Sequence, residues 1–457
     1  MRRFRGGFSE IALTGGEHFN YGSDHHDILS KATDPDQAQN LLADDRTGRP
    51  DLSQLEAEGT MFLSGFVHRV ELFQIAERWF REKLESSDAR RLTEILIADG
   101  FILGETLQDL TRFLVHELHP QTAACTGHPI SFKGQLRNAL LCFQGDLTPR
   151  VRELLSTYQR NPDFFYRDAP INGVMYLGGS GELLAACRIK RPRRVAEKAN
   201  RRIASWLFSI VQSEAEKLAG ERAIRMGVPL SLLLTPEEEM VEEFALAEEI
   251  ISRKFISGEI SFDPEFLTIN DVGGIKMIGT PEELLMIEEF LSQRRNCRIV
   301  ERESLQGLYN AVNLIVEIPW NREEVCRRYE KKRWWEHVGN RGLSEAYLRR
   351  GLSCLLGNAD NSIKIEVILT TFPDLVESEL GNSIHEKRII AQRDNKDYKG
   401  NIPLNIEFLV EYLFAVGFSP RIEVDSIPIH LWGRYLPDTL FSHIRRLHNM
   451  PPQDLFY

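Results

Sequence analysis

The chain has 457 residues and a formal net charge of −11 at pH 7, with 42% hydrophobic and 27% charged residues. One hydrophobic core seldom serves so long a chain, so two or three domains are expected, and the composition excludes a disordered or fibrous protein. The negative charge argues against a protein that coats nucleic acid through bulk electrostatics, which leaves only local sites for phosphate groups.

Six cysteines lie far apart without a C-x-x-C pair, which is typical of a reducing compartment. No run of about 18 apolar residues occurs, and no apolar segment follows the basic N-terminus MRRFRGG. We therefore expect a cytoplasmic protein with no membrane among its partners.

The first part of the chain falls into two segments. Residues 1–55 mix Gly, Asp, His and Pro with little periodicity, and predict a loosely structured leader. Residues 56–160 repeat apolar residues at helical spacing, as in FVHRVELFQIAERWFREKL. This second segment is predicted to form a helical N-terminal domain without strands.

Residues 161–395 change character and predict an α+β domain. The segments at 174–190, 266–279, 308–320 and 362–372 are rich in strand formers. A helix is expected to begin near Pro192, a helical insertion to cover about 199–260, and Thr280-Pro-Glu-Glu to start another helix. These elements predict a mixed sheet flanked by helices. Residues 396–457 predict an accessory region with one helix and one strand.

Charged side chains gather on these predicted elements. Asp271 and Glu366 fall in two separate predicted strands, and Glu366 interrupts an apolar run. Carboxylate oxygens are ligands for Mg²⁺, and Lys and Arg neutralise phosphate groups. The basic segment at 188–198 contributes Arg188, Lys190, Arg194 and Lys198. Together they indicate phosphoryl or pyrophosphoryl transfer.

Four segments resemble the RelA/SpoT-type alarmone synthetases in order and setting. RIKRPRRVAEK (188–198) is similar to the family's R-x-K-x-P-x-S-x-x-x-K, and DVGGIK (271–276) to D-x-x-G-I-R. LYNAVNLIVEIP (308–319) resembles N-G-Y-x-S-x-H-L-I-V-E-I-P. Glu366 with the later SELG and HEK segments resembles E-I-Q-I-R-T…A-E-L-G-x-x-x-H-x-K.

The resemblance implies a nucleotidyltransferase-like fold and an enzyme that moves pyrophosphate from ATP to the 3′-hydroxyl of a guanosine nucleotide. It implies that Asp271 binds the Mg²⁺ cofactor, and that Glu366 binds this metal or activates the acceptor hydroxyl. Tyr309 would stack on the acceptor base. Lys276 and Asn313 stand where the family has Arg and His, and are expected to contact nucleotide.

Two departures leave the activity open. Ile368 and Thr370 replace the polar Gln and Arg that follow the family's catalytic Glu. Three readings therefore stand: an active synthetase with altered contacts, a relative that uses an adenosine nucleotide or an RNA end as acceptor, and a nucleotide-binding protein without turnover. The expected partners are nucleotides and, through the helical N-terminal domain, an RNA or a protein regulator.

Two further signals have alternative interpretations. GGSGEL (178–183) is similar to the phosphate-binding turn of polymerase-β-type nucleotidyltransferases, but no Asp-x-Asp pair follows, and a simple turn is favoured. KKRWW (331–335) combines cations with stacking surface that suits a nucleotide base, although a helix that buries its Trp side is favoured.

Overall fold

The computed structural model describes residues 63–120, 125–233, 236–263, 267–381 and 401–451. Contacts divide the chain into two units, and the smaller one comprises Met1–Gly59 and Leu234–Glu242. The leader predicted at 1–55 lies outside the described residues. The fold and the site below belong to the larger unit, Thr60–Leu233 with Glu243–Tyr457.

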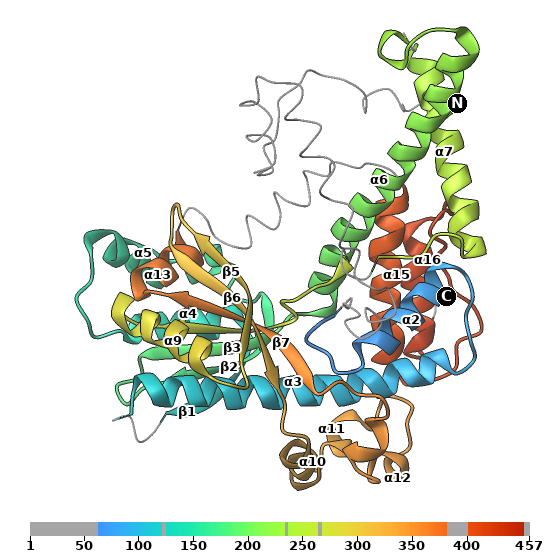
Figure 1. Cartoon of the computed structure of the whole chain (residues 1–457). Helices are drawn as coiled ribbons and strands as arrows, with labels where there is room; N and C mark the ends of the chain where they lie inside the picture. Colours follow the sequence, from blue (N-terminus) through green and yellow to red (C-terminus); the bar gives the residue numbers. More distant parts are fainter. Residues whose placement is uncertain (1–62, 121–124, 234–235, 264–266, 382–400, 452–457) are drawn as a thin grey trace. The chain divides into compact units, whose positions relative to one another are not determined.

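Seven strands form one mixed sheet in the order β1-β2-β3-β4-β7-β6-β5 (Figure 1). Neighbouring strands are antiparallel except for β4 and β7, which run parallel. The predicted α+β class is confirmed. The strands are β1 (Thr126–Phe132), β2 (Pro170–Leu177), β3 (Leu183–Ile189), β4 (Gly273–Ile278), β5 (Arg298–Leu305), β6 (Ala311–Pro319) and β7 (Ser362–Thr370).

The described part of the chain also forms helices, of which some pack on the sheet and others pack on neighbouring helices. They are α2 (Arg69–Phe80), α3 (Asp88–Leu118), α4 (Lys133–Ala139), α5 (Pro149–Arg160), α6 (Pro192–Met226), α7 (Glu237–Ser257), α9 (Pro281–Gln293), α10 (Arg322–Lys331), α11 (Trp335–Val338), α12 (Glu345–Leu348), α13 (Phe372–Leu380), α15 (Asn401–Gly417) and α16 (Pro437–Leu447). None of these described helices has both the length and the apolar character needed to cross a bilayer.

Helix α3 packs against one face of the sheet and forms a common core with it (Figure 1). Side chains alternate between the faces of a strand, so one set of positions on the central strands turns toward α3. These are Cys187, Ile275, Leu314 and Val367, all buried in that core. Gly273 permits the close approach, since a Cβ there would lie 2.8 Å from Leu103 Cδ1. The neighbouring positions, such as Gly274 and Lys276, turn to the opposite face.

Two groups of helices contribute to the opposite face. Helices α4, α5 and α13 form a second core with the strand ends, which contains Leu136, Leu154, Leu183, Ile278 and Leu375. Helix α6 begins at Pro192 as predicted, after the extended residue Arg191, and ends at Gly227 in the left-handed region at φ 69°. Proline suits a first helical turn and glycine a helix end, so these two residues fix the length of α6.

The structure differs from the predicted elements in three places. Strand β1 interrupts the segment predicted to be helical throughout, and β5 lies where no strand is predicted. Neither has an apolar alternation, because six of the eight residues of β5 are exposed and only Ile130 is buried in β1. The strand predicted within residues 396–457 is absent from the described part of that region: Ile427, Ile429 and Leu431 are buried alternately, but they pair with no described strand.

Candidate active site

A cavity of about 380 Å³ lies on the face of the sheet opposite α3. Its lining comes from the central strands, the start of α6 and parts of α4 and α13. All nine residues predicted as site residues line this one cavity: Arg188, Lys190, Arg194, Lys198, Asp271, Lys276, Tyr309, Asn313 and Glu366. Segments that are far apart in the sequence therefore meet at a single site.

The sheet register aligns part of this lining in two rows. In the first row, Arg188 lies opposite Gly274, and Gly274 lies opposite Glu366. In the second row, Ile368 lies between Lys276 and Asn313. A Cβ at position 274 would lie 3.1 Å from Glu366 Oε2, so the glycine leaves the space that this carboxylate occupies.

Two lysines hold the first carboxylate. Asp271 lies just before β4, which begins at Gly273, and not within a strand as predicted. Lys190 Nζ contacts Asp271 Oδ2 and also donates to the Asp271 backbone carbonyl, while Lys198 Nζ contacts the same Oδ2. Glu366 Oε2 lies 3.7 Å from Lys190 Nζ. One ammonium group therefore touches both predicted metal-binding carboxylates.

Burial and charge shift the pKa values of this group. Burial alone would raise the pKa of Asp271, but the ammonium groups of Lys190 and Lys198 outweigh it and hold this pKa well below its usual range. Burial lowers the pKa of Lys190 to about 8, against the opposing pull of Glu366 and Asp271. Asp271 is therefore a carboxylate at neutral pH, and most Lys190 side chains carry a proton.

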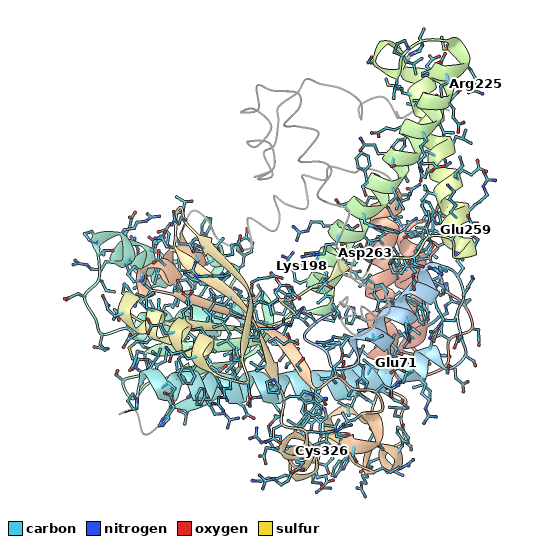
Figure 2. The ribbon with its side chains drawn as sticks, viewed as in Figure 1. Glu71, Lys198, Arg225, Glu259, Asp263 and Cys326 are labelled. Atoms are coloured by element: carbon cyan, nitrogen blue, oxygen red, sulfur yellow. The ribbon has the colours of Figure 1, made fainter. Side chains whose placement is uncertain are left out.

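The first turns of α6 present cations to the cavity. Arg194, Lys198 and Arg201 recur at helical spacing and line it on the same side of the helix, as does Arg191 before the first turn. Figure 2 labels Lys198 on this part of α6 and Arg225 at the far end of the same helix. Arg201 was missed as a site residue, although its spacing of three from Lys198 would have indicated it.

Another cation group surrounds Glu379 of α13, which is 3% exposed. Its carboxylate accepts from Lys133 Nζ at 3.1 Å, from Arg137 Nη2 at 3.3 Å and from Lys276 Nζ at 3.4 Å. Burial lowers the pKa of Lys276, and Glu379 opposes this shift. Lys133 and Glu379 line the cavity but were not predicted, because nothing local in the sequence brings α4 next to α13.

The remaining predicted residues lie on β6 and just before it. Tyr309 precedes β6 and does not belong to a strand as predicted. The Oδ1 atom of Asn313 is buried and has no hydrogen-bond partner among the described residues. Of the two departures noted in the sequence, only Ile368 lines this cavity, whereas Thr370 is buried and donates to the Asn310 carbonyl at 3.3 Å.

The carboxylates provide few ligands for a metal. Among the described residues, no group of three or more His, Cys, Asp or Glu side chains could hold an ion. Magnesium in phosphate-transfer sites is often bound by only one or two carboxylates, with substrate phosphates and water completing its shell. Asp271 and Glu366 fit such a shared site, provided that Lys190 leaves the space between them.

The two alternative signals lie away from the cavity. GGSGEL forms the turn between β2 and β3, at the opposite end of β3 from Arg188, and none of its residues lines the cavity. This turn therefore contributes nothing to the cavity. Trp334 is half-buried, with its ring centroid 5.2 Å from that of Phe101 of α3. Residues 332–334 form a turn, so KKRWW is not the helix that was favoured, although its Trp side is packed.

Comparisons with known proteins give little support beyond this geometry. No family model and no curated protein matches the chain. Among solved structures, the small alarmone synthetase 1 from Bacillus subtilis is matched at 11% identity, over 46% of this chain and 88% of that chain, with a TM-score of 0.18. A TM-score this low carries no conclusion about fold or function.

Proposed function

We propose that this protein is a Mg²⁺-dependent pyrophosphotransferase with a nucleotidyltransferase-like fold, which moves pyrophosphate from ATP to the 3′-hydroxyl of a nucleotide. The observation that supports this best is the charge of the cavity, given that the whole chain is acidic. Eight cationic side chains line it against three carboxylates: Lys133, Arg188, Lys190, Arg191, Arg194, Lys198, Arg201 and Lys276. Such a local excess of positive charge suits a polyphosphate.

In the proposed reaction the donor's phosphates lie along the first turns of α6, near Arg194, Lys198 and Arg201. The acceptor's 3′-oxygen attacks the β-phosphorus of ATP, the bond between the β-phosphorus and the α–β bridging oxygen breaks, and AMP leaves with that oxygen. Magnesium would neutralise charge on the phosphates. Asp271 would hold this metal, and Glu366 would either share it or accept the proton of the attacking hydroxyl.

The acceptor is proposed to be a guanosine nucleotide, held on the side of the cavity near β6. Tyr309 offers a ring for stacking on its base. The unpaired Oδ1 of Asn313 can accept a hydrogen bond from a base N–H group. An adenosine nucleotide or an RNA end would offer similar donors, so the choice of acceptor has to be measured.

A second candidate is a nucleotide-binding protein without turnover. Ile368 favours it, because this apolar side chain lies between Lys276 and Asn313, where a polar contact to the acceptor would be expected. In that case the cations would still bind a polyphosphate, and no product would form.

The test is to incubate the protein and Mg²⁺ with γ-labelled ATP and, separately, GDP, GTP, ADP or tRNA. We expect label to move to one acceptor, and Asp271→Asn or Glu366→Gln to reduce this rate at least about a hundredfold. Arg225→Ala, at the far end of α6, is the matched control and should keep the wild-type rate. ATP binding without any labelled product would favour the second candidate. If the protein neither bound ATP nor formed a labelled product, the two candidate functions would be refuted.

A further inference from the structure

The ammonium group of Lys190 lies where a cation shared by Asp271 and Glu366 would lie. It contacts Asp271 Oδ2, the Asp271 backbone carbonyl and, at 3.7 Å, Glu366 Oε2. A lysine ammonium has three N–H donors. Asp271 provides two close oxygens for them, and Glu366 Oε2, which is too far for a hydrogen bond, adds its negative charge. All three oxygens are also of the kind that Mg²⁺ and Mn²⁺ prefer.

The backbone fixes this position. The Lys190 N–H donates to the Val272 carbonyl at 2.8 Å, which continues the pairing of β3 with β4 by one residue. The Lys190 side chain is 14% exposed, and both carboxylates are 15% exposed. Lys198 adds a second ammonium on the same Asp271 oxygen and is 29% exposed. The carboxylates are thus already neutralised by residues of the chain itself.

We propose that Lys190 is a built-in cation, which keeps divalent metal off the Asp271–Glu366 pair until a polyphosphate draws the lysine away. A metal ion could enter only against the charge of this ammonium. A bound polyphosphate gives Lys190 and Lys198 another anion to contact, and it brings oxygens that complete the shell of the metal. Metal and polyphosphate would then strengthen each other's binding by the same factor.

The exclusion of metal by Lys190 is independent of catalysis, whereas its relief by a polyphosphate rests on the proposed function. The two statements can therefore fail separately. A protein that transfers no pyrophosphate could still exclude metal, and an active enzyme could bind metal without nucleotide.

The direct test is Mn²⁺ binding to the free protein, measured by the loss of the electron paramagnetic resonance signal of free Mn²⁺. Lys190→Met should bind one Mn²⁺ about tenfold or more tightly than wild type. Adding Asp271→Asn or Glu366→Gln to this variant should remove the gain. Equal affinity of Lys190→Met and wild type, or a gain that survives these second substitutions, would overturn the proposal.

Lys276→Met is the matched control, because it removes the same charge from the same cavity. Its ammonium contacts Glu379 and not the carboxylate pair, so a much smaller gain is expected. An equal gain would mean that Lys190 acts through general electrostatics and not by occupying the site, which would refute the proposal.

A second measurement needs no Lys190 variant, in case Lys190→Met does not fold. Without phosphate, wild type and Asp271→Asn should bind Mn²⁺ equally, because the Asp271 site is closed in both. With α,β-methylene-ATP such a site should appear, because this analogue has the triphosphate but cannot be cleaved between its α and β phosphorus atoms. A site already present without the analogue contradicts exclusion, and its absence in both conditions contradicts the relief by polyphosphate.

Discussion

Two aspartates hold buried cations in opposite settings. Asp99 of α3 binds His68 at 2.6 Å through His68 Nδ1, and both side chains are 0% exposed. Asp271 binds Lys190 and Lys198 at the edge of a cavity large enough for a ligand. Both aspartates are ion-paired and mostly removed from water, so neither pairing nor burial separates a structural ion pair from a functional one. The feature that separates a functional ion pair from a structural one is access to a cavity.

The His68 pair is closed because every polar atom of its ring has a partner. His68 Nε2 lies 3.1 Å from the Leu356 carbonyl, and the His68 backbone N–H donates to Asp99 Oδ2 at 2.9 Å. The Leu356 carbonyl can only accept, so Nε2 donates to it, and Nδ1 faces the Asp99 carboxylate. This arrangement favours the cationic form of the imidazole, in line with its raised pKa. Nothing in this arrangement is left for a ligand.

The largest expected difference between the two pairs is in stability. Asp99→Asn should lower the free energy of unfolding by about 3 to 5 kcal/mol, because it leaves the buried His68 cation without its counter-charge. Asp271→Asn should lower it by less than about 1.5 kcal/mol, because Lys190 and Lys198 can turn toward water in the cavity. Urea unfolding of both variants measures this, and equal losses would remove the distinction drawn above.

The next effect concerns the open pair and its surroundings. Arg201→Ala should weaken binding of α,β-methylene-ATP about tenfold to a hundredfold, through loss of a charge-assisted contact to phosphate. The same substitution at Arg225, which is exposed at the other end of α6, should change the affinity less than about twofold, because screened surface charges act weakly at long range. Calorimetric titration distinguishes the two, and equal weakening would rule out α6 as a phosphate-binding helix.

The smallest effect is a pH dependence of the closed pair. Burial disfavours the His68 cation, but the hydrogen bond and charge of Asp99 outweigh burial and raise the pKa of His68 above 6.5. The resulting stability is fully present below the unfolded pKa and is lost as pH rises through the folded pKa, by about 1.4 kcal/mol per unit of pKa shift. Urea midpoints across this range should fall in wild type and stay flatter in His68→Gln. An equal fall of the urea midpoint in wild type and in His68→Gln would assign the pH dependence to other groups.

The nine residues predicted for the site all line one cavity, whereas several predicted strands differ from those in the structure. Each of the nine predicted residues belongs to a short segment whose residue order resembles a known family, and such segments can be recognised without the intervening chain. Glu379 falls in the SELG segment of this resemblance but was assigned no role, and Lys133 lies in no such segment. Their contact joins α4 to α13, and only the packing of the second core brings these helices together.

The missed and misassigned strands have a similar physical reason. The exposed surface of β5 gives no alternation of apolar residues, because β5 lies at the sheet edge and β6 is its only partner among the described strands. Conversely, Ile427, Ile429 and Leu431 alternate as in a strand because each is buried in the core, although none of the described strands pairs with them. An alternation of apolar residues indicates which residues are buried, but it does not show that the segment pairs with another strand.

Gly273 and Gly274 are adjacent, yet they serve opposite layers of the molecule. The first leaves room for Leu103 of α3, and the second leaves room for the Glu366 carboxylate. A side chain at Gly273 would push the core apart, whereas a side chain at Gly274 would displace a group of the cavity. The requirement for folding therefore acts at Gly273, and the requirement for the cavity acts at the adjacent Gly274. A substitution at either position would meet a different constraint.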